Sequence, residues 1–331
     1  MTTALLFVFL VIALAFIFDF INGFHDAANS TATIISTGIL TPRQAVIWAA
    51  FFNFIAFLFF HLSVANTIGI GLINPNIVDT YLIFSALSGA IIWNLITWYF
   101  GLPSSSSHAL MGGLIGAALV KGGFAVIIMS GFIKIALAIV FSPLLGFIMG
   151  SLLMLITHKL ARNWSQVKQN RWFGYTQFVS AAMLSLAHGG NDAQKTMGII
   201  AVLLFSTHLI TGDFHVPFWV VISCNLVMAL GTLAGGCRIV DTMGKKITSL
   251  TTRSGCSAET GASLTLFLAT YLGIPVSTTH TITGAITGTS MMTLHTIQWG
   301  IIKRIVYAWI MTLPIAGLIA GLLMLAKQIF I

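Results

Sequence analysis

Long stretches without a charged residue make up most of the chain, and short charged segments separate them. Several stretches exceed the roughly 20 apolar residues that a helix needs to cross a bilayer. Lipid offers no water to backbone polar groups, so such spans form helices, and the alternating ten-residue segments typical of an outer-membrane barrel are missing. The pattern predicts an all-α polytopic membrane protein of about 10–12 membrane segments. The uncharged stretches are residues 1–18, 44–78, 80–120, 135–158, 172–191, 196–212, 214–237, 260–302 and 305–326.

Composition supports this class and narrows the partners. The 331 residues are 57% hydrophobic and 7% charged, whereas soluble domains carry roughly a quarter charged residues. A soluble globule is therefore excluded. The formal net charge is +8, but the basic residues lie in short loops between apolar stretches, where the positive-inside rule places cytoplasmic anchors. We expect membrane lipid, and no nucleic acid, as a partner.

The chain repeats itself. A shift of 172 residues aligns residues 85–116 with residues 257–288 and gives 11 identities in 32 positions, among them Pro103/Pro275 and His108/His280. Two further blocks align in the same order, namely residues 23–27 with 189–193 and residues 143–150 with 314–321. Such self-similarity indicates duplicated structural units. We therefore divide the chain into a first repeat (1–157), a cytoplasmic linker (158–171) and a second repeat (172–331).

Loop charges indicate that the two repeats have opposite orientations. The loop with Arg43 has a counterpart near residues 206–215 that carries only Asp213, whereas residues 66–79 hold only Asp79 and their counterpart, residues 238–251, is basic. Equivalent loops of opposite charge character should face opposite sides of a membrane. The chain is therefore predicted to contain two inverted-topology repeats, with the N-terminus outside and an even number of crossings within residues 101–157.

Two matched polar motifs interrupt the apolar stretches. The first runs from Asp19 to Ser30 and the second from His188 to Thr196. Buried ionisable groups cost several kcal/mol and mark functional sites by default. Transporters with inverted repeats place their sites at broken helices near the midplane, so we expect a helix break at each motif. The candidates for cation or proton coupling are His25, Asp26, Asn29, Asn191, Asp192 and Lys195, and the candidates for substrate binding are Gly23, Gly189 and Gly190.

A second pair of matched elements combines proline with hydroxyl groups. Residues 101–108 read Gly-Leu-Pro-Ser-Ser-Ser-Ser-His, and residues 273–280 read Gly-Ile-Pro-Val-Ser-Thr-Thr-His. Proline ends a helix, and the following Ser or Thr caps a new helix whose N-terminus suits an anion. We assign substrate binding to Ser105, Ser106, Ser107, Ser277, Thr278 and Thr279. We place His108 and His280 with the coupling residues, as proton carriers, ligands or partners of the helix caps.

These residues resemble the inorganic phosphate transporter (PiT) family. That family carries a Gly-x-Asn-Asp-x-x-Asn signature in each half and a Pro-x-Ser-x-Thr-His-like element after it, and the likeness covers nearly the whole chain. The resemblance implies symport of inorganic phosphate with sodium or protons, re-entrant helical hairpins that hold the substrate, no cofactor, a homodimer, and a multi-pass location in the cell membrane, as in the inner membrane of bacteria. It also implies that the signature and hydroxyl residues bind phosphate and the coupling cations.

Two departures from the family pattern favour one coupling ion. His25 and Lys195 stand where the signatures have asparagine. An ammonium cannot ligate sodium and can replace a bound cation, and Lys195 is placed to pair with Asp192 at i,i+3. We predict a secondary active symporter that couples phosphate to protons by alternating access. The resemblance to the proton-driven bacterial branch of the family implies that phosphate can travel as a neutral complex with a divalent metal. No protein metal site is predicted. Sodium-coupled phosphate symport, and a permease for sulfate or another oxyanion, are the alternatives.

Enzymatic and passive functions fit less well. An intramembrane hydrolase would use Ser107/His108 or Thr279/His280, but side chains adjacent in sequence diverge, whereas a catalytic nucleophile and its base must meet. A passive channel does not account for the asymmetric charges of the two signatures. The sequence therefore predicts a transporter and no enzyme.

Overall fold

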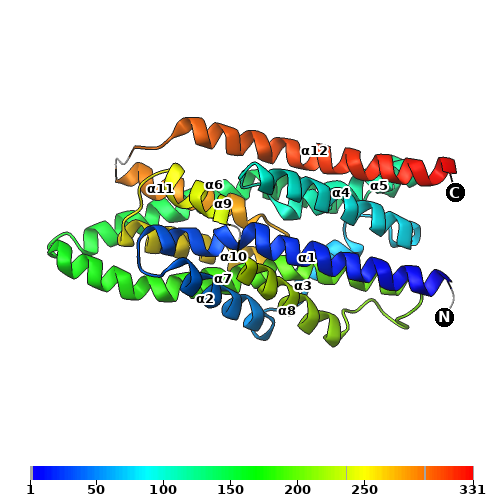
Figure 1. Cartoon of the computed structure of the whole chain (residues 1–331), viewed down its shortest axis with the longest axis horizontal. Helices are drawn as coiled ribbons and strands as arrows, with labels where there is room; N and C mark the ends of the chain where they lie inside the picture. The colour runs from blue at the N-terminus through cyan, green and yellow to red at the C-terminus, as the bar shows by residue number, and fades with distance from the viewer. Residues whose placement is uncertain (1–2, 236, 294–295, 331) are drawn as a thin grey trace.

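The computed structural model describes residues 3–235, 237–293 and 296–330, and this part of the chain is helical (Figure 1). It contains no named β-strand, and short 3₁₀ and π-helical turns join the α-helices. The prediction of an all-α fold is confirmed. The α-helices are α1 (Thr3–Ser36), α2 (Pro42–Ile55), α3 (Ser63–Ile70), α4 (Thr80–Tyr99), α5 (Ser106–Gly122), α6 (Met129–Leu160), α7 (Gln166–Ser206), α8 (Phe218–Ala234), α9 (Cys237–Asp241), α10 (Thr252–Tyr271), α11 (Thr278–Met292) and α12 (Trp299–Phe330).

Several helices are suited to a bilayer. Within the described residues, α1, α4, α6 and α12 are each long and apolar enough to cross a membrane. The pairs α2–α3 and α8–α9 pass the same test as bent units, and the first pair turns by 80° between its helices. Large apolar side chains such as Leu137, Val140 and Leu318 remain exposed on α6 and α12, as expected of surfaces that face lipid. The chain is a multi-pass membrane protein.

Two helical hairpins, α4–α5 and α10–α11, have matching construction. Helices α4 and α10 both have 20 residues. After each of them a glycine adopts a left-handed backbone, with φ +63° at Gly101 and +66° at Gly273, a conformation that glycine adopts without steric cost. Ser105 and Ser277 then accept hydrogen bonds from the backbone N–H three residues later and begin α5 and α11. The predicted helix starts after each proline are confirmed.

The hairpins enter from opposite ends of the bundle. Asp79, which caps α4, pairs with Lys121 at 2.5 Å and with Lys327 of α12 at 3.9 Å, so the open end of α4–α5 lies at the end that holds both chain termini (Figure 1). Arg253, at the start of α10, donates to Gln169 of the linker, at the other end. Because α5 turns back at the hairpin tip, residues 101–157 contain one returning hairpin arm and one long helix.

Each hairpin packs on a long helix of the other half. Helix α5 packs along α12, and α11 packs along α6. Glycines make this close approach feasible, because a Cβ at Gly116 would meet the backbone of Gly317 and a Cβ at Gly146 would meet the backbone of Thr281. The spaced glycines of α6 and α12 therefore serve helix packing, in line with small-xxx-small faces in membranes.

The expected helix breaks at the polar motifs are wrong. Helix α1 continues without interruption through Asp19–Ser30, and α7 continues through His188–Thr196. Neither motif contains proline. Most polar side chains of the two motifs have partners on neighbouring helices, so the backbone of each motif keeps its helical hydrogen bonds. Of the two matched pairs of motifs, the Pro-containing pair is the one that interrupts helices, at the hairpin tips.

Candidate functional site

A polar centre forms where the motifs of α1 and α7 meet the two hairpin tips. The fourteen predicted site residues with polar side chains are all 2% exposed or less, so the centre is closed to solvent in this conformation. They are His25, Asp26, Asn29, Ser105, Ser106, Ser107, His108, Asn191, Asp192, Lys195, Ser277, Thr278, Thr279 and His280.

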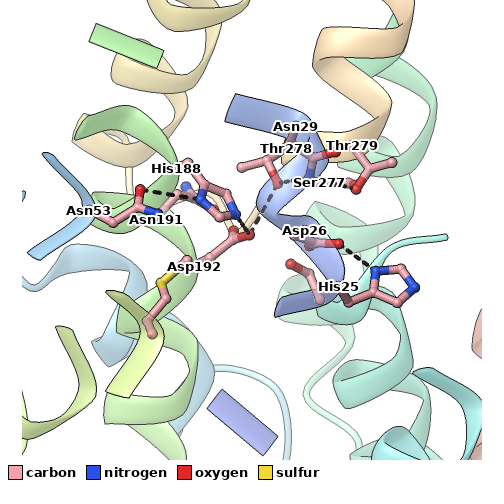
Figure 2. A network of polar contacts seen from close by, with 12 residues as sticks. His25, Asp26, Asn29, Asn53, His188, Asn191, Asp192, Ser277, Thr278 and Thr279 are labelled. Carbon is pink, nitrogen blue, oxygen red and sulfur yellow. Dashed lines mark hydrogen bonds and ion pairs between the residues drawn. The ribbon is translucent and has the colours of Figure 1, made fainter. Parts of the chain in front are cut away.

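The two signature carboxylates come together, as the sequence predicts. Ligand atoms of Asp26, Asp192 and His188 all lie within 4.8 Å of one another. Figure 2 shows Asp192 on α7 directed at His188 and Thr278, and Asp26 on α1 beside them with its carboxylate directed at His25. The duplicated motif therefore builds one centre from both halves of the chain.

Asp192 is held by cationic and hydroxyl donors. Lys195 Nζ lies 2.5 Å from one carboxylate oxygen of Asp192. The other oxygen lies 3.3 Å from His188 Nε2 and accepts a hydrogen bond from Thr278 at 3.1 Å. The predicted i,i+3 ion pair is confirmed. The hydrogen bond from Thr278 joins Asp192 of α7 to the tip of the second hairpin.

Lys195 also reaches both hairpin tips. Its ammonium donates to Ser107 Oγ of α5 at 2.5 Å and to the Val276 carbonyl before α11 at 2.8 Å. Together with the Asp192 carboxylate, the ammonium thus has three oxygen partners. Three donors meeting three acceptors leave this buried cation fully paired, which removes most of the cost of burying it.

Asp26 has a different set of neighbours. Its carboxylate lies 2.7 Å from His25 Nδ1 (Figure 2). The other nitrogen of His25 lies 3.1 Å from Thr97 Oγ1 of α4 and 3.4 Å from Ser104 Oγ of the first hairpin tip. His25 thus links the α1 carboxylate to the hairpin α4–α5.

Asn29 connects α1 to the second hairpin. Its Nδ2 donates to Thr278 at 3.1 Å and to Thr279 at 2.9 Å. Asn191, which the shift of 166 residues aligns with His25, links α7 to α10 by donating to Thr270 at 2.9 Å. The amide oxygens of both asparagines and the Ser106 hydroxyl have no partner among the described residues. These free groups, next to two helix N-termini, can bind an anion and its accompanying cation.

The three predicted glycines lie at helix contacts. A Cβ on Gly23 would meet the backbone of Met228, one on Gly189 would meet the backbone of Asn53, and one on Gly190 would meet the ring of Phe60. Their backbone groups lie inside continuous helices. Close packing is the role that the geometry gives them, and their part in substrate binding stays a prediction.

His108 and His280 face each other. Their ring centroids lie 4.6 Å apart, and His280 stacks on Trp309 at 3.8 Å. Their ring nitrogens have no hydrogen-bond partner within the described residues. The pair joins the first turns of α5 and α11, and its role in coupling stays a prediction.

Two buried ionisable residues, His188 and Glu259, are not among the predicted site residues. His188 belongs to the second polar motif and approaches Asp192 at i,i+4 within α7, but its approach to Asp26 depends on how α1 and α7 pack. Glu259 of α10 is fully buried and accepts hydrogen bonds from Thr33 at 2.6 Å, Gln177 at 3.0 Å and Ser180 at 2.5 Å. The signal for Glu259 is present, because it is the sole acidic residue in an otherwise uncharged helical stretch between Arg253 and Lys303.

Comparisons with known proteins place the chain in a family. The model of the phosphate transporter family matches residues 22–320. The chain belongs to this family, which is one of transporters rather than enzymes.

Individual relatives agree along the full length. A protein of Rhizobium meliloti (strain 1021), named a probable low-affinity inorganic phosphate transporter, is 58% identical over 96% of this chain and 96% of its own length. A Bacillus subtilis (strain 168) protein of the same name is 41% identical over 97% of each chain. A solved structure described as the sodium-dependent phosphate transporter matches with a TM-score of 0.86 and 25% identity over 98% of this chain and all of that one.

Proposed function

We propose that this protein is a secondary active symporter that moves inorganic phosphate across the cell membrane together with protons. The observation that carries the choice of proton is the position of Lys195. A shift of 166 residues places Asn29 of the first half on residue 195. Asn29 contacts Thr279 in the first turn of α11, and Lys195 contacts the equivalent Ser107 in the first turn of α5.

The surroundings of Lys195 are those of a bound cation. Carboxylate, hydroxyl and backbone carbonyl oxygens surround its ammonium at 2.5, 2.5 and 2.8 Å. Hard metal cations choose oxygen ligands of these types. The ammonium occupies this set of oxygen ligands, so a coupling sodium ion has no free position among them. This supports proton coupling, even though one structural relative is described as sodium-dependent.

Phosphate binding is assigned to the hydroxyl groups at the hairpin tips. The helix N-termini of α5 and α11 present backbone N–H groups and a positive dipole end. The hydroxyls of Ser106, Thr278 and Thr279 lie in or beside the first turns of these helices. The nearby carboxylates of Asp26 and Asp192 can accept a hydrogen bond from a phosphate oxygen that still carries a proton, which sulfate lacks near neutral pH. The site therefore favours phosphate over sulfate.

Uptake by purified protein in proteoliposomes tests the coupling ion. We expect phosphate accumulation driven by an inward pH gradient to be unchanged when sodium is replaced by choline. Loss of uptake on that replacement, at a fixed pH gradient, would defeat proton coupling and favour sodium symport.

A specific observation also favours a neutral metal phosphate as the transported form. The ligand atoms of Asp26, His188 and Asp192 lie within 4.8 Å of one another, and carboxylate and imidazole groups bind divalent metals. The metal here is cargo, brought with phosphate. Uptake of phosphate and of a radioactive divalent metal in equal amounts, both lost after chelation, is the expected result. Phosphate uptake that chelation leaves intact would exclude this form.

The architecture supports alternating access by two inverted repeats, residues 1–157 and 172–331. The matched hairpins enter from opposite ends and meet at the centre, as expected for a site that opens to each side in turn. The basic linker, residues 158–171, is assigned to the cytoplasm. A homodimer and contacts with membrane lipid remain predictions. Cysteine labelling of the linker in intact cells and in inverted vesicles tests the orientation.

A further inference from the structure

A further buried carboxylate lies outside the predicted site. Asp19 precedes Asp26 by seven residues, which is two turns of α1, so both lie on the same face of the helix. Its side chain is 0% exposed. One carboxylate oxygen, Oδ1, accepts a hydrogen bond from Thr196 at 2.8 Å. The other oxygen, Oδ2, has no hydrogen-bond partner among the described residues.

No cation balances this carboxylate. Within the described residues, no Lys, Arg or His nitrogen lies within 4.0 Å of Asp19. The titratable groups that act on it from the helices packed against α1 are Asp192 of α7 and Cys224 of α8, and both are acids. A buried carboxylate without a cation and with one oxygen unbonded costs several kcal/mol. Asp192 and Glu259, by contrast, have partners on both oxygens.

A neighbouring acceptor lacks a donor as well. Asn22 lies one turn after Asp19 on the same face of α1, it is 1% exposed, and its Oδ1 has no partner among the described residues. A proton on Asp19 Oδ2 turns this oxygen into an O–H donor, and Asn22 Oδ1 is an acceptor that lacks a donor. A hard metal cation usually takes six or more oxygen ligands, whereas a proton needs the oxygen that carries it and one hydrogen-bond acceptor. The arrangement therefore fits a proton.

The position of Asp19 gives such a proton a route. Helix α1 begins at the end of the bundle that holds both chain termini (Figure 1), so Asp19 lies between that end and Asp26. Thr196, which donates to Asp19, directly follows Lys195 in α7. Asp19 is therefore connected through one residue to the ion pair of Lys195 with Asp192.

We propose that Asp19 is a proton-binding site of the transport cycle, filled from the side of the membrane where the chain termini lie and distinct from the central pair of carboxylates. An O–H bond forms at Oδ2 when a hydronium ion on that side transfers its proton and becomes water. The bond breaks when the site opens to the other side and the proton passes to water there. The inference rests on the proposed function, because it requires transport that is coupled to protons.

The central experiment compares wild type with Asp19→Asn in proteoliposomes. The amide resembles the protonated acid but cannot release a proton. We expect the variant to exchange internal for external phosphate at a rate near that of wild type, while accumulation driven by a pH gradient falls to the level seen without the gradient. Unchanged gradient-driven accumulation in Asp19→Asn would overturn the proposal. Failure of wild type itself to use the gradient would instead overturn the proposed proton coupling.

Two further measurements keep the proposal testable if Asp19→Asn does not fold. Asn22→Leu keeps the carboxylate but removes the acceptor for its proton, so the pH profile of uptake should move to lower pH; an unchanged profile contradicts the proposal. Infrared spectra of wild type should show the C=O stretch of a buried carboxylic acid that Asp19→Glu displaces, and a spectrum without such a band also contradicts it. If uptake has a sodium-stimulated component and Asp19→Asn removes it, Asp19 binds a metal cation and the proposed proton site is overturned.

Discussion

Asn29 and Lys195 occupy equivalent positions in the two halves, and each contacts the first turn of the opposite half's hairpin. Asn29 donates to Thr279 at 2.9 Å, and Lys195 donates to Ser107 at 2.5 Å. A neutral amide and a charged ammonium therefore occupy the same place in two related frameworks. The two contacts match in sequence position and in the helix turn that they reach but differ in charge, and most of the expected behaviour follows from that difference.

Lys195→Asn should change the coupling ion. Removing the ammonium leaves the Asp192 carboxylate buried without its partner, which typically costs about 3–5 kcal/mol, and a small cation can occupy the vacated position. We expect gradient-driven uptake to be lost at low sodium and partly recovered at high sodium. Uptake by purified variant in sodium and in choline media measures this. Lys303→Asn, at an exposed lysine of α12, is the matched control and should behave as wild type.

Asp26→Asn and Asp192→Asn should each abolish transport while the protein still inserts and folds. The two carboxylates lie within 4.8 Å of each other, and the neutral amide keeps the shape of the side chain but not its charge. Phosphate uptake and the elution profile in size-exclusion chromatography provide the two readouts. Normal uptake by both variants would remove these carboxylates from the mechanism.

Thr278→Val should weaken transport, and Thr278→Ser should not. The Thr278 hydroxyl accepts from Asn29 and donates to Asp192, and a hydrogen bond to a charged group contributes roughly 1.5–3 kcal/mol. The valine variant keeps the branched shape without the hydroxyl, so we expect uptake to fall by about tenfold or more. Initial rates over a range of phosphate concentrations test this. Equal rates for the two variants would show that the hydroxyl has no part in transport.

Arsenate should compete with phosphate, and sulfate should not. Arsenate, like phosphate, retains a proton near neutral pH and can donate to the carboxylates of Asp26 or Asp192, whereas sulfate cannot. Uptake of radioactive phosphate in the presence of each competitor decides the matter. Strong inhibition by sulfate would identify the protein as a less selective oxyanion permease.

Gly116→Leu should destabilise the bundle. A side chain at this position meets the backbone of Gly317 on α12, and forcing atoms into a packed contact costs about 1–3 kcal/mol. We expect a lower midpoint of thermal unfolding in detergent. Gly300→Leu is the matched control, because nothing lies within 4 Å of a Cβ at that position. A similar shift in both variants would mean that the close approach of α5 and α12 contributes no stability.

The sequence predicts those features that arise from local chemistry. Proline followed by hydroxyl residues predicts both hairpin tips, and the duplicated motifs predict that Asp26 and Asp192 come together. The expected helix breaks at those motifs failed because polar side chains alone do not break a helix when packing supplies their partners. The partners of Glu259 come from helices distant in sequence, and so does Asp26 as a neighbour of His188, so no local pattern specifies these contacts. Asp19 lies in the first polar motif, but the lack of a hydrogen-bond partner for its Oδ2 among the described residues is a property of the packed structure.

The crossed packing of hairpins and long helices has a consequence for motion. Helix α12 lies along α5, and α6 lies along α11, with glycines that bring their backbones into contact. The proposed alternating access therefore requires moving units that each combine a hairpin from one repeat with a long helix from the other. Rotation of one repeat alone would separate these close backbone contacts, so each proposed moving unit draws on both halves of the chain.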